Sequence, residues 1–307
     1  MSFVNIVLRR FKLNKIFLFF ARTGFRFFQK IGLHITPNHY YLPIPDTSKL
    51  KKELWERKSE LVGLDMRLEE QKELLTKFSS RYKQEYDSFP VEKTNVEHQY
   101  YLNNRDFGRV DAEILYCIIR HFKPKNIIEI GSGHSTYLSA QALVVNKERD
   151  GASGELIAIE PYPRGALERG FPGLTKFVKK CVQDVELSFF DQLGENDILF
   201  IDSSHVLTIG NDVQFEYLEL LPRLKKGVIV HIHDIFLPLE YPREWVIDNM
   251  RFWNEQYLLQ AFLAFNDHYQ VLWAGTYMSL NYPIELEKAF KTYTYKFTPG
   301  SFWIKKI

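Results

Sequence analysis

Acidic and histidine side chains gather at two points of the sequence, each at or just after the end of an apolar run. Asp202 and His205 lie in the stretch FIDSSH, and His231, His233 and Asp234 lie in the stretch VIVHIHDIF. These two short stretches hold three of the nine histidines of the chain. A histidine can take a proton near neutral pH from a reacting hydroxyl group. The pattern therefore indicates acid–base chemistry, with His205 as the first candidate base and His233 as the second.

A glycine turn precedes both stretches. The segment IIEIGSGHST joins an apolar run to a helix-like segment through the turn at 131–133. Glycines let the backbone approach a ligand closely, and the following helix points its N-terminal amides at that ligand. A dinucleotide fingerprint needs a third glycine where this chain has Thr136. Glu160 ends the next apolar run, which is the place where an acid binds a ribose hydroxyl.

Seven apolar runs are the expected strands that position these residues. They lie at 126–130, 155–160, 175–180, 197–202, 227–235, 269–275 and 301–307. Helical segments separate the first five, which predicts a parallel sheet with both faces covered. The carboxyl ends of parallel strands line one crevice, so Asp202, His205, His233 and Asp234 should converge there. One long helix is expected at 242–265.

The order of these motifs resembles the class I S-adenosylmethionine-dependent methyltransferases, over roughly residues 105–307. The stretches IEIGSGHST, FIDSSH and VIVHIHDIF are similar to the small-molecule and sugar O-methyltransferases (methyltransferase family 24-like). The resemblance implies a doubly wound, mostly parallel, seven-stranded α/β sheet of the Rossmann-like kind. It also implies S-adenosylmethionine as the cofactor and methyl transfer to a hydroxyl of a small-molecule or glycan-like acceptor.

The resemblance further implies cofactor contacts at particular positions. Glu160 would accept hydrogen bonds from both ribose hydroxyls, and Asp184 would lie near the adenine. The turn and the residues around it would hold the methionine part. The full set of expected cofactor-binding residues is Glu129, Gly131, Ser132, Gly133, Ser135, Thr136, Glu160, Asp184 and Asp202.

A divalent metal is a competing use of the acidic residues. Related metal-dependent O-methyltransferases place acids after the fourth and fifth strands, so Asp202, His233 and Asp234 are candidate metal ligands. Such a metal binds the acceptor oxygen and lowers its pKa. His233 stands where an acid is common, and a site with histidine suits Mn²⁺, Fe²⁺ or Zn²⁺ better than Mg²⁺. A histidine base and a metal both stay open, whereas His231 is expected to point into a packed layer.

The first 45 residues differ in charge from the rest of the chain. They carry seven Arg and Lys residues and no acid, which leaves 33 of the 40 basic residues against 38 acids. An acidic body is a poor partner for nucleic acid. The longest uncharged run, 16–21, is too short to cross a bilayer. Two interpretations remain for this segment: it lies on an anionic membrane surface, or it packs on the body or on a second subunit of a homo-oligomer.

Three parts are therefore expected along the chain. They are a basic segment and linker at 1–45, a helical cap at 46–104 with helices at 47–62 and 64–86, and a methyltransferase domain at 105–307. Two cysteines make neither a disulfide framework nor a metal motif, which fits a reducing cytoplasm. Two other functions stay open: a non-catalytic membrane-surface binding protein on this fold, and an NAD-dependent oxidoreductase, against which Thr136 counts.

Overall fold

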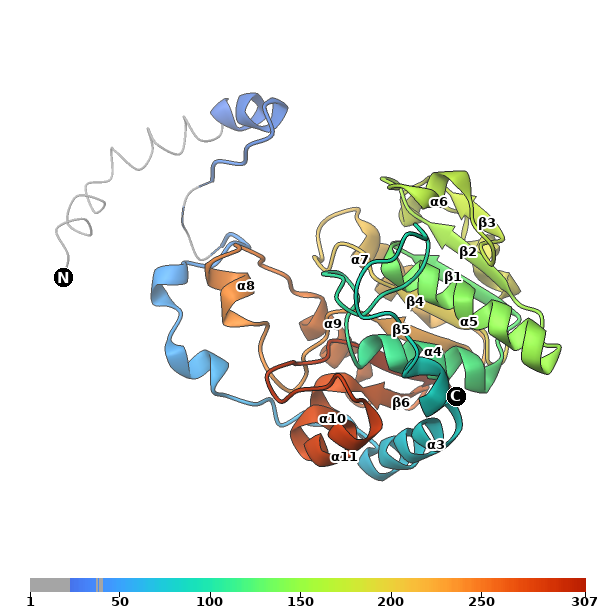
Figure 1. Ribbon diagram of the computed structural model, residues 1–307. Coiled ribbons are helices and arrows are strands. Elements are labelled where there is room, and N and C mark those ends of the chain that lie inside the picture. Colours follow the sequence, from blue (N-terminus) through green and yellow to red (C-terminus); the bar gives the residue numbers. More distant parts are fainter. Residues whose placement is uncertain (1–22, 37, 39–40) are drawn as a thin grey trace. The chain divides into compact units, whose positions relative to one another are not determined.

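The computed structural model describes residues 23–36, 38 and 41–307. It divides into two compact units, Met1–Leu54 and Trp55–Ile307. The larger unit is built on a seven-stranded sheet between helices (Figure 1). Its strands are β1 (Asn126–Ile130), β2 (Glu155–Ile159), β3 (Lys176–Val178), β4 (Ile198–Ile201), β5 (Ile229–Ile232), β6 (Tyr269–Ala274) and β7 (Phe302–Lys306). All seven predicted strands are present, and their ends differ from the prediction by at most three residues.

The strands follow the order β3-β2-β1-β4-β5-β7-β6. β1 to β5 are parallel to one another, whereas β7 is antiparallel to both β5 and β6. The predicted doubly wound, mostly parallel sheet is therefore confirmed. The chain moves outward from β1 to β3 and then returns to the other side of β1 at β4. In such sheets a ligand binds at the carboxyl ends of the strands where the order reverses, here between β1 and β4.

Both faces of the sheet are covered, because the central strands are apolar on both sides. Alternate residues of a strand point to opposite faces, so Ile127 packs in one core and Ile128 in the other. The first core includes α3 (Leu68–Tyr86), α4 (Asp111–Phe122), α5 (His134–Asp150), α10 (Gly275–Asn281) and α11 (Pro283–Ala289). The second core includes α7 (Asp212–Phe215), the π-helical turn η5 (Glu216–Leu220) and α9 (Glu255–Leu263). The remaining elements of the larger unit are α6 (Ala166–Arg169), α8 (Arg243–Ile247), η3 (Val182–Asp184), η4 (Leu187–Gln192) and η6 (Leu221–Arg223).

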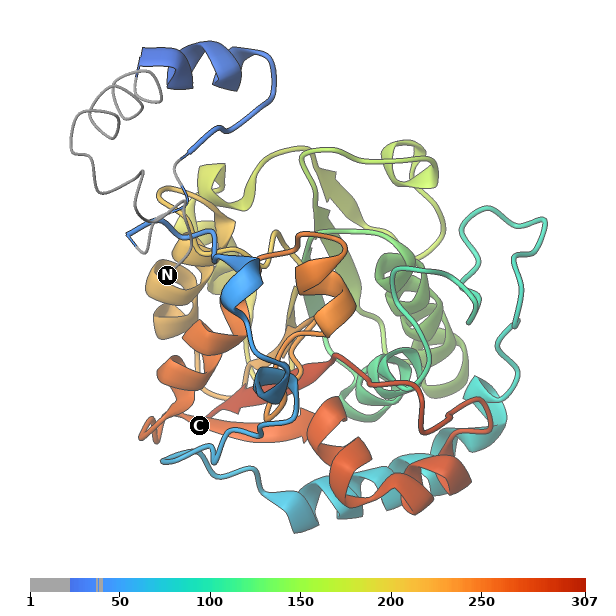
Figure 2. The same ribbon diagram turned by 90° about the vertical axis from the view of Figure 1, so that its left-hand side faces the viewer.

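Helix α3 shares the first core with the sheet. Figure 2 shows it running beside α10 and α11. A buried ion pair joins it to α4, where Arg120 Nε lies 2.9 Å from the Glu85 carboxylate. Tyr116 donates a hydrogen bond to the same carboxylate (2.7 Å), and Arg120 also pairs with Asp150 of α5 at 2.7 Å. These contacts fix α3 against two helices of the sheet domain.

The predicted helix at 47–62 is wrong. Only two short 3₁₀ turns form there, η1 (Thr47–Lys49) and η2 (Lys52–Trp55), and the helix α3 begins only at Leu68. Leu61, Gly63 and Arg67 have φ angles of 51°, 76° and 48°. A right-handed helix needs negative φ angles, so these positions end any helix that the polar pattern of the sequence favours.

The predicted single helix at 242–265 is also wrong, because it is two helices, α8 and α9, joined by an irregular segment. The backbone N–H groups of Asn254 and Glu255 donate to the carbonyl oxygen of His205, at 3.1 and 3.2 Å. Met250 lies between the two helices with φ 55°. Tertiary hydrogen bonds thus replace helical ones and bring the start of α9 to His205. Within the part of the chain that the structure describes, no helix has the length and apolar character needed to cross a membrane.

Candidate functional site

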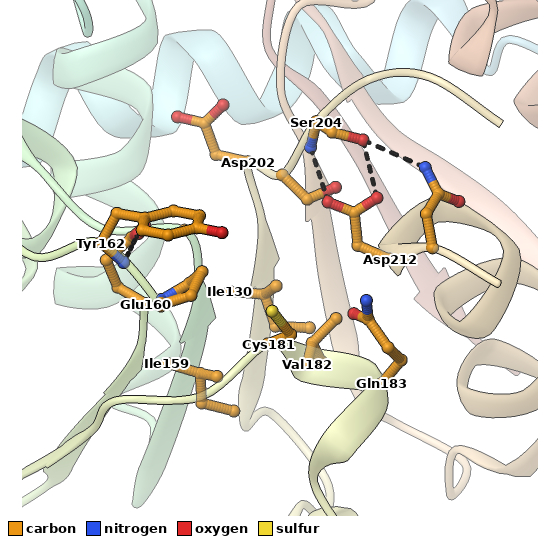
Figure 3. A pocket seen from close by; sticks show the side chains of 14 residues that line it. Ile130, Ile159, Glu160, Tyr162, Cys181, Val182, Gln183, Asp202, Ser204 and Asp212 are labelled. Carbon is orange, nitrogen blue, oxygen red and sulfur yellow. Dashed lines mark hydrogen bonds between the residues drawn. The ribbon is translucent and has the colours of Figure 1, made fainter. Parts of the chain in front are cut away.

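A pocket of about 350 Å³ opens at the carboxyl ends of β1, β2 and β4. Figure 3 shows Glu160 and Tyr162 on one side of it and Ser204 and Asp212 on the opposite side, with η3 contributing its floor. Its volume is in the range of small-molecule sites. The lining residues are Ile130, Gly131, Ile159, Glu160, Pro161, Tyr162, Cys181, Val182, Gln183, Asp202, Ser203, Ser204, Asn211 and Asp212. The pocket thus lies where the strand order reverses.

Gly131 lets the turn after β1 lie directly against the end of β4. It has φ 77°, and a Cβ atom at this position would lie 1.8 Å from the carbonyl oxygen of Asp202. Its N–H donates to Ile159 O (3.0 Å), while the N–H of Asp202 donates to Ile130 O (2.9 Å). Only glycine has room here, because both the φ angle and the close contact exclude a side chain. The glycine turn and the end of β4 are therefore in direct contact.

Glu129 lies buried beneath the turn with one oxygen unused. Its Oε1 accepts hydrogen bonds from Ser135 Oγ (2.5 Å) and Thr136 Oγ1 (3.0 Å), and Thr136 Oγ1 accepts one from Gly133 N (2.9 Å). Its Oε2 and the nearby Ser132 Oγ are buried and have no hydrogen-bond partner among the described residues. Burial raises the pKa of Glu129 to about 8 against the opposing effect of the two hydroxyl donors. A cationic group beside Oε2 would favour its ionised form.

His205 is buried and is surrounded by three carboxylates. Its Nε2 is 3.2 Å from Asp202 Oδ1 and 3.7 Å from Asp234 Oδ2, and its Nδ1 is 2.9 Å from Glu255 Oε2. Burial opposes a charge on the ring, but hydrogen bonds with Asp202 and Glu255 outweigh it and raise the pKa of His205 well above its ordinary value. The carboxylates at its two nitrogens therefore favour the protonated ring. The residue has φ 61°, a strained backbone conformation that is common at functional sites.

Glu255 supports this histidine from the first turn of α9. It is completely buried, and its Oε1 accepts a hydrogen bond from Tyr217 (3.1 Å). The ring of Trp253 lies against His205 with centroids 4.4 Å apart. The sequence pattern left Glu255 inside the expected long helix, either facing outward or capping the site, and did not indicate His205 as its partner. The break between α8 and α9 is what directs Glu255 inward.

His233 and Asp234 follow β5 and complete the cluster. His233 Nε2 is 3.6 Å from Asp234 Oδ1. Burial lowers the pKa of His233, but the carboxylates of Asp234, Asp202 and Asp111 outweigh it and raise that pKa overall. Burial also raises the pKa of Asp234, which has φ 55°. Asp111, from the start of α4, accepts hydrogen bonds from the N–H groups of Gly300 and Ser301, each at 3.0 Å. The predicted convergence of the strand ends is thus what the structure shows.

His231 is a packing residue, as expected. It is fully buried and stacks on Phe200 with ring centroids 4.0 Å apart. Burial lowers its pKa well below the ordinary value, so its ring is neutral.

The predicted metal ligands do not form a metal-binding group. Among the residues that the structure describes, no group of three or more His, Cys, Asp or Glu side chains could hold a metal ion. Between the carboxylates of Asp202 and Asp234 lies the ring nitrogen of His205.

Comparison with known proteins agrees with this geometry. A protein-family model described as a methyltransferase domain matches residues 128–235, which run from β1 to the segment after β5. An uncharacterized protein of Archaeoglobus fulgidus is 35% identical over 179 residues, covering 55% of this chain and 78% of the relative. The chain belongs to this methyltransferase family. Membership makes it a class I methyltransferase and implies S-adenosylmethionine as the methyl donor.

The residues around the pocket of this methyltransferase fit that cofactor. The unpartnered Glu129 Oε2 and Ser132 Oγ suit the polar methionine end. Glu160 follows β2 and uses Oε1 to accept from Tyr162 N (2.6 Å), so its other oxygen is available for a ribose hydroxyl. Val182 and Gln183 line the expected adenine end, whereas Asp184 is exposed and is not part of the lining.

The other predicted cofactor contacts of the methyltransferase do not all line the pocket. Gly131 and Asp202 line the pocket. Ser135 and Thr136 are buried, and their hydroxyls bond to Glu129, so they support the turn from below. Gly133 leaves open space where a Cβ atom would stand. Three lining residues that the sequence pattern did not indicate are Tyr162, in the loop after β2, Gln183, in the short turn η3, and Asp212, at the start of α7.

Proposed function

We propose that this methyltransferase transfers the methyl group of S-adenosylmethionine to a hydroxyl of a small-molecule or glycan-like acceptor. The supporting observation is that Asp202 belongs to two parts of the site. This residue lines the cofactor pocket, and its side chain also contacts His205 in the buried carboxylate–histidine cluster. Acid–base groups thus stand next to the cofactor pocket, where an acceptor must lose a proton.

The cofactor supplies an electrophilic methyl group on a sulfonium. A hydroxyl that takes this methyl group loses one proton, which the chain must receive. Asp234 suits this role, because burial raises the pKa of its carboxyl and so makes the carboxylate a better proton acceptor. His205 suits a different role from the expected one, because an imidazolium has no lone pair to act as a base. It instead places positive charge near the acceptor oxygen, because both of its ring nitrogens already lie within hydrogen-bond distance of carboxylates.

Glu255 and Asp202 keep His205 in this state. Both carboxylates lie within hydrogen-bond distance of its ring, one at each nitrogen. They fix the plane of the imidazole and stabilise its charge. Such pre-positioned charge beside the reacting oxygen, together with a placed base, is the usual source of rate enhancement in group transfer.

Calorimetry tests the cofactor first. Titration with S-adenosylmethionine and, separately, with NAD should show binding of the first alone. Absence of S-adenosylmethionine binding at millimolar concentration would overturn the proposal, and NAD binding would favour an oxidoreductase.

Turnover assays test the acceptor chemistry. Formation of S-adenosylhomocysteine is measured with panels of phenols, sugars and amines, in the presence and absence of a chelator. Asp234→Asn and His205→Gln should keep cofactor binding and lose about 100- to 10,000-fold in turnover with hydroxyl acceptors. His268→Gln, which changes an exposed histidine, is the matched control. Methylation of amines only, or full activity of both variants, contradicts the proposed role of the cluster.

A further inference from the structure

The smaller unit carries a segment that methyl transfer does not use. Its first 45 residues contain seven cations and no acid, and the first 28 contain eight of the 25 phenylalanines of the chain. A segment that is only solvated has no use for so many large aromatic side chains. A segment buried in a core would not carry one cation for every few apolar residues. The composition thus indicates a surface that is both apolar and anionic.

The described part of this segment separates the two kinds of side chain. Residues 23–30 are helical, and Arg26 and Lys30 are four residues apart, so they share one side of the helix. Phe27 and, just after the helix, Ile31 are also four residues apart and are 62% and 57% exposed. Leu33 continues the exposed apolar set. Arg26 and Lys30 thus form one stripe, and Phe27 and Ile31 form a second stripe beside it.

We propose that residues 23–35 bind an anionic lipid surface. Phe27, Ile31 and Leu33 enter the boundary between headgroups and acyl chains, while Arg26 and Lys30 contact lipid phosphates. The charge pattern favours this occupant over a second copy of the segment, because a second copy would bring cations against cations. The exposed aliphatic side chains Ile31 and Leu33 favour it over the backbone of nucleic acid, which is contacted chiefly by cations and polar groups. The methyltransferase would then work at a membrane surface.

Vesicle co-sedimentation of the full chain tests this proposal. The protein should sediment with vesicles of phosphatidylcholine plus phosphatidylglycerol and stay in the supernatant with phosphatidylcholine alone. Each cation near an anionic surface contributes about fivefold to binding. The double substitution Arg26→Gln/Lys30→Gln should therefore weaken binding about 25-fold, and Phe27→Gln/Ile31→Gln should weaken it as well.

A matched control separates position from net charge. Lys288→Gln/Lys296→Gln removes two exposed cations of the larger unit and should leave vesicle binding unchanged. Equal binding to both kinds of vesicle, or equal loss in the control, overturns the proposal. Self-association that the segment variants abolish in the absence of lipid also overturns it, since the occupant is then another copy. Binding of S-adenosylmethionine, measured on the same preparations, reports the proposed function independently.

Discussion

The substitution Glu129→Gln measures how the ionisation of the buried carboxyl beneath the glycine turn lowers the free energy of unfolding. Glutamine has nearly the same shape and keeps an oxygen for Ser135 and Thr136. Burial raises the pKa of Glu129 from 4.5 to about 8, so the folded protein holds this proton at neutral pH. The stability that this carboxyl contributes is therefore fully present below about pH 4.5. It is lost as the pH rises towards 8, where an ionised carboxylate must be buried.

The size of this loss follows from the difference in pKa. A difference of about 3.5 corresponds to about 5 kcal/mol, at about 1.4 kcal/mol per pKa unit, as an upper value. A domain has a total stability of about 5 to 15 kcal/mol, so the effect is large enough to measure. The uncharged glutamine variant has no such loss. Its stability relative to the wild type should therefore rise by about 4 kcal/mol between about pH 5 and about pH 8.

Urea denaturation of both proteins across this pH range measures the difference, in which the titration of all other groups cancels. The exposed Asp184→Asn is the control and should show no such trend. Saturating S-adenosylmethionine at high pH should stabilise the wild type more than the variant, because its cationic ammonium group would lie beside the ionised carboxylate. A stability difference that stays constant with pH would refute the argument, since the carboxyl would then not be held protonated by burial.

Three further substitutions give distinct outcomes. Gly131→Ala should lower the free energy of unfolding by more than about 2 kcal/mol and abolish cofactor binding, whereas Gly133→Ala, with open space at its Cβ, should leave the melting temperature nearly unchanged. Arg120→Met should cost about 3 to 5 kcal/mol in chemical denaturation, because it breaks buried ion pairs, while Arg223→Met at an exposed pair should cost at most about 1 kcal/mol. Glu255→Gln should lower the pKa of His205 in an NMR titration, because one of its two close carboxylates is lost; an unchanged pKa would exclude Glu255 as its support.

The parallel strands were predictable because their signal is local. Each is a short apolar run, and burial on both faces leaves few other structures for such a run. The residues at the strand ends followed from the sheet, since parallel strands bring their carboxyl ends to one edge. Asp202, His205, His233 and Asp234 could therefore be grouped before any coordinates were known.

The errors arose where tertiary contacts outweigh local preference. The segment 242–265 has the apolar spacing of one helix, but hydrogen bonds to the His205 carbonyl stop it before α9. Glu255 was consequently missed, and Gln183 rather than Asp184 lines the pocket because a three-residue 3₁₀ turn rotates the chain there. Contacts between distant segments leave no periodic mark in the sequence, so neither position could be inferred from spacing.

The positive φ angles of His205 and Asp234 have a consequence for how this protein would change under selection. Each such conformation costs a residue with a side chain about 1 to 2 kcal/mol, and glycine avoids that cost. A library selected for thermal stability alone should accumulate glycine at position 234 but not at 205, where loss of the ring would leave the buried carboxylate of Glu255 without its partner. A library selected for methyl transfer should keep the aspartate, so the two sets of survivors would diverge at position 234.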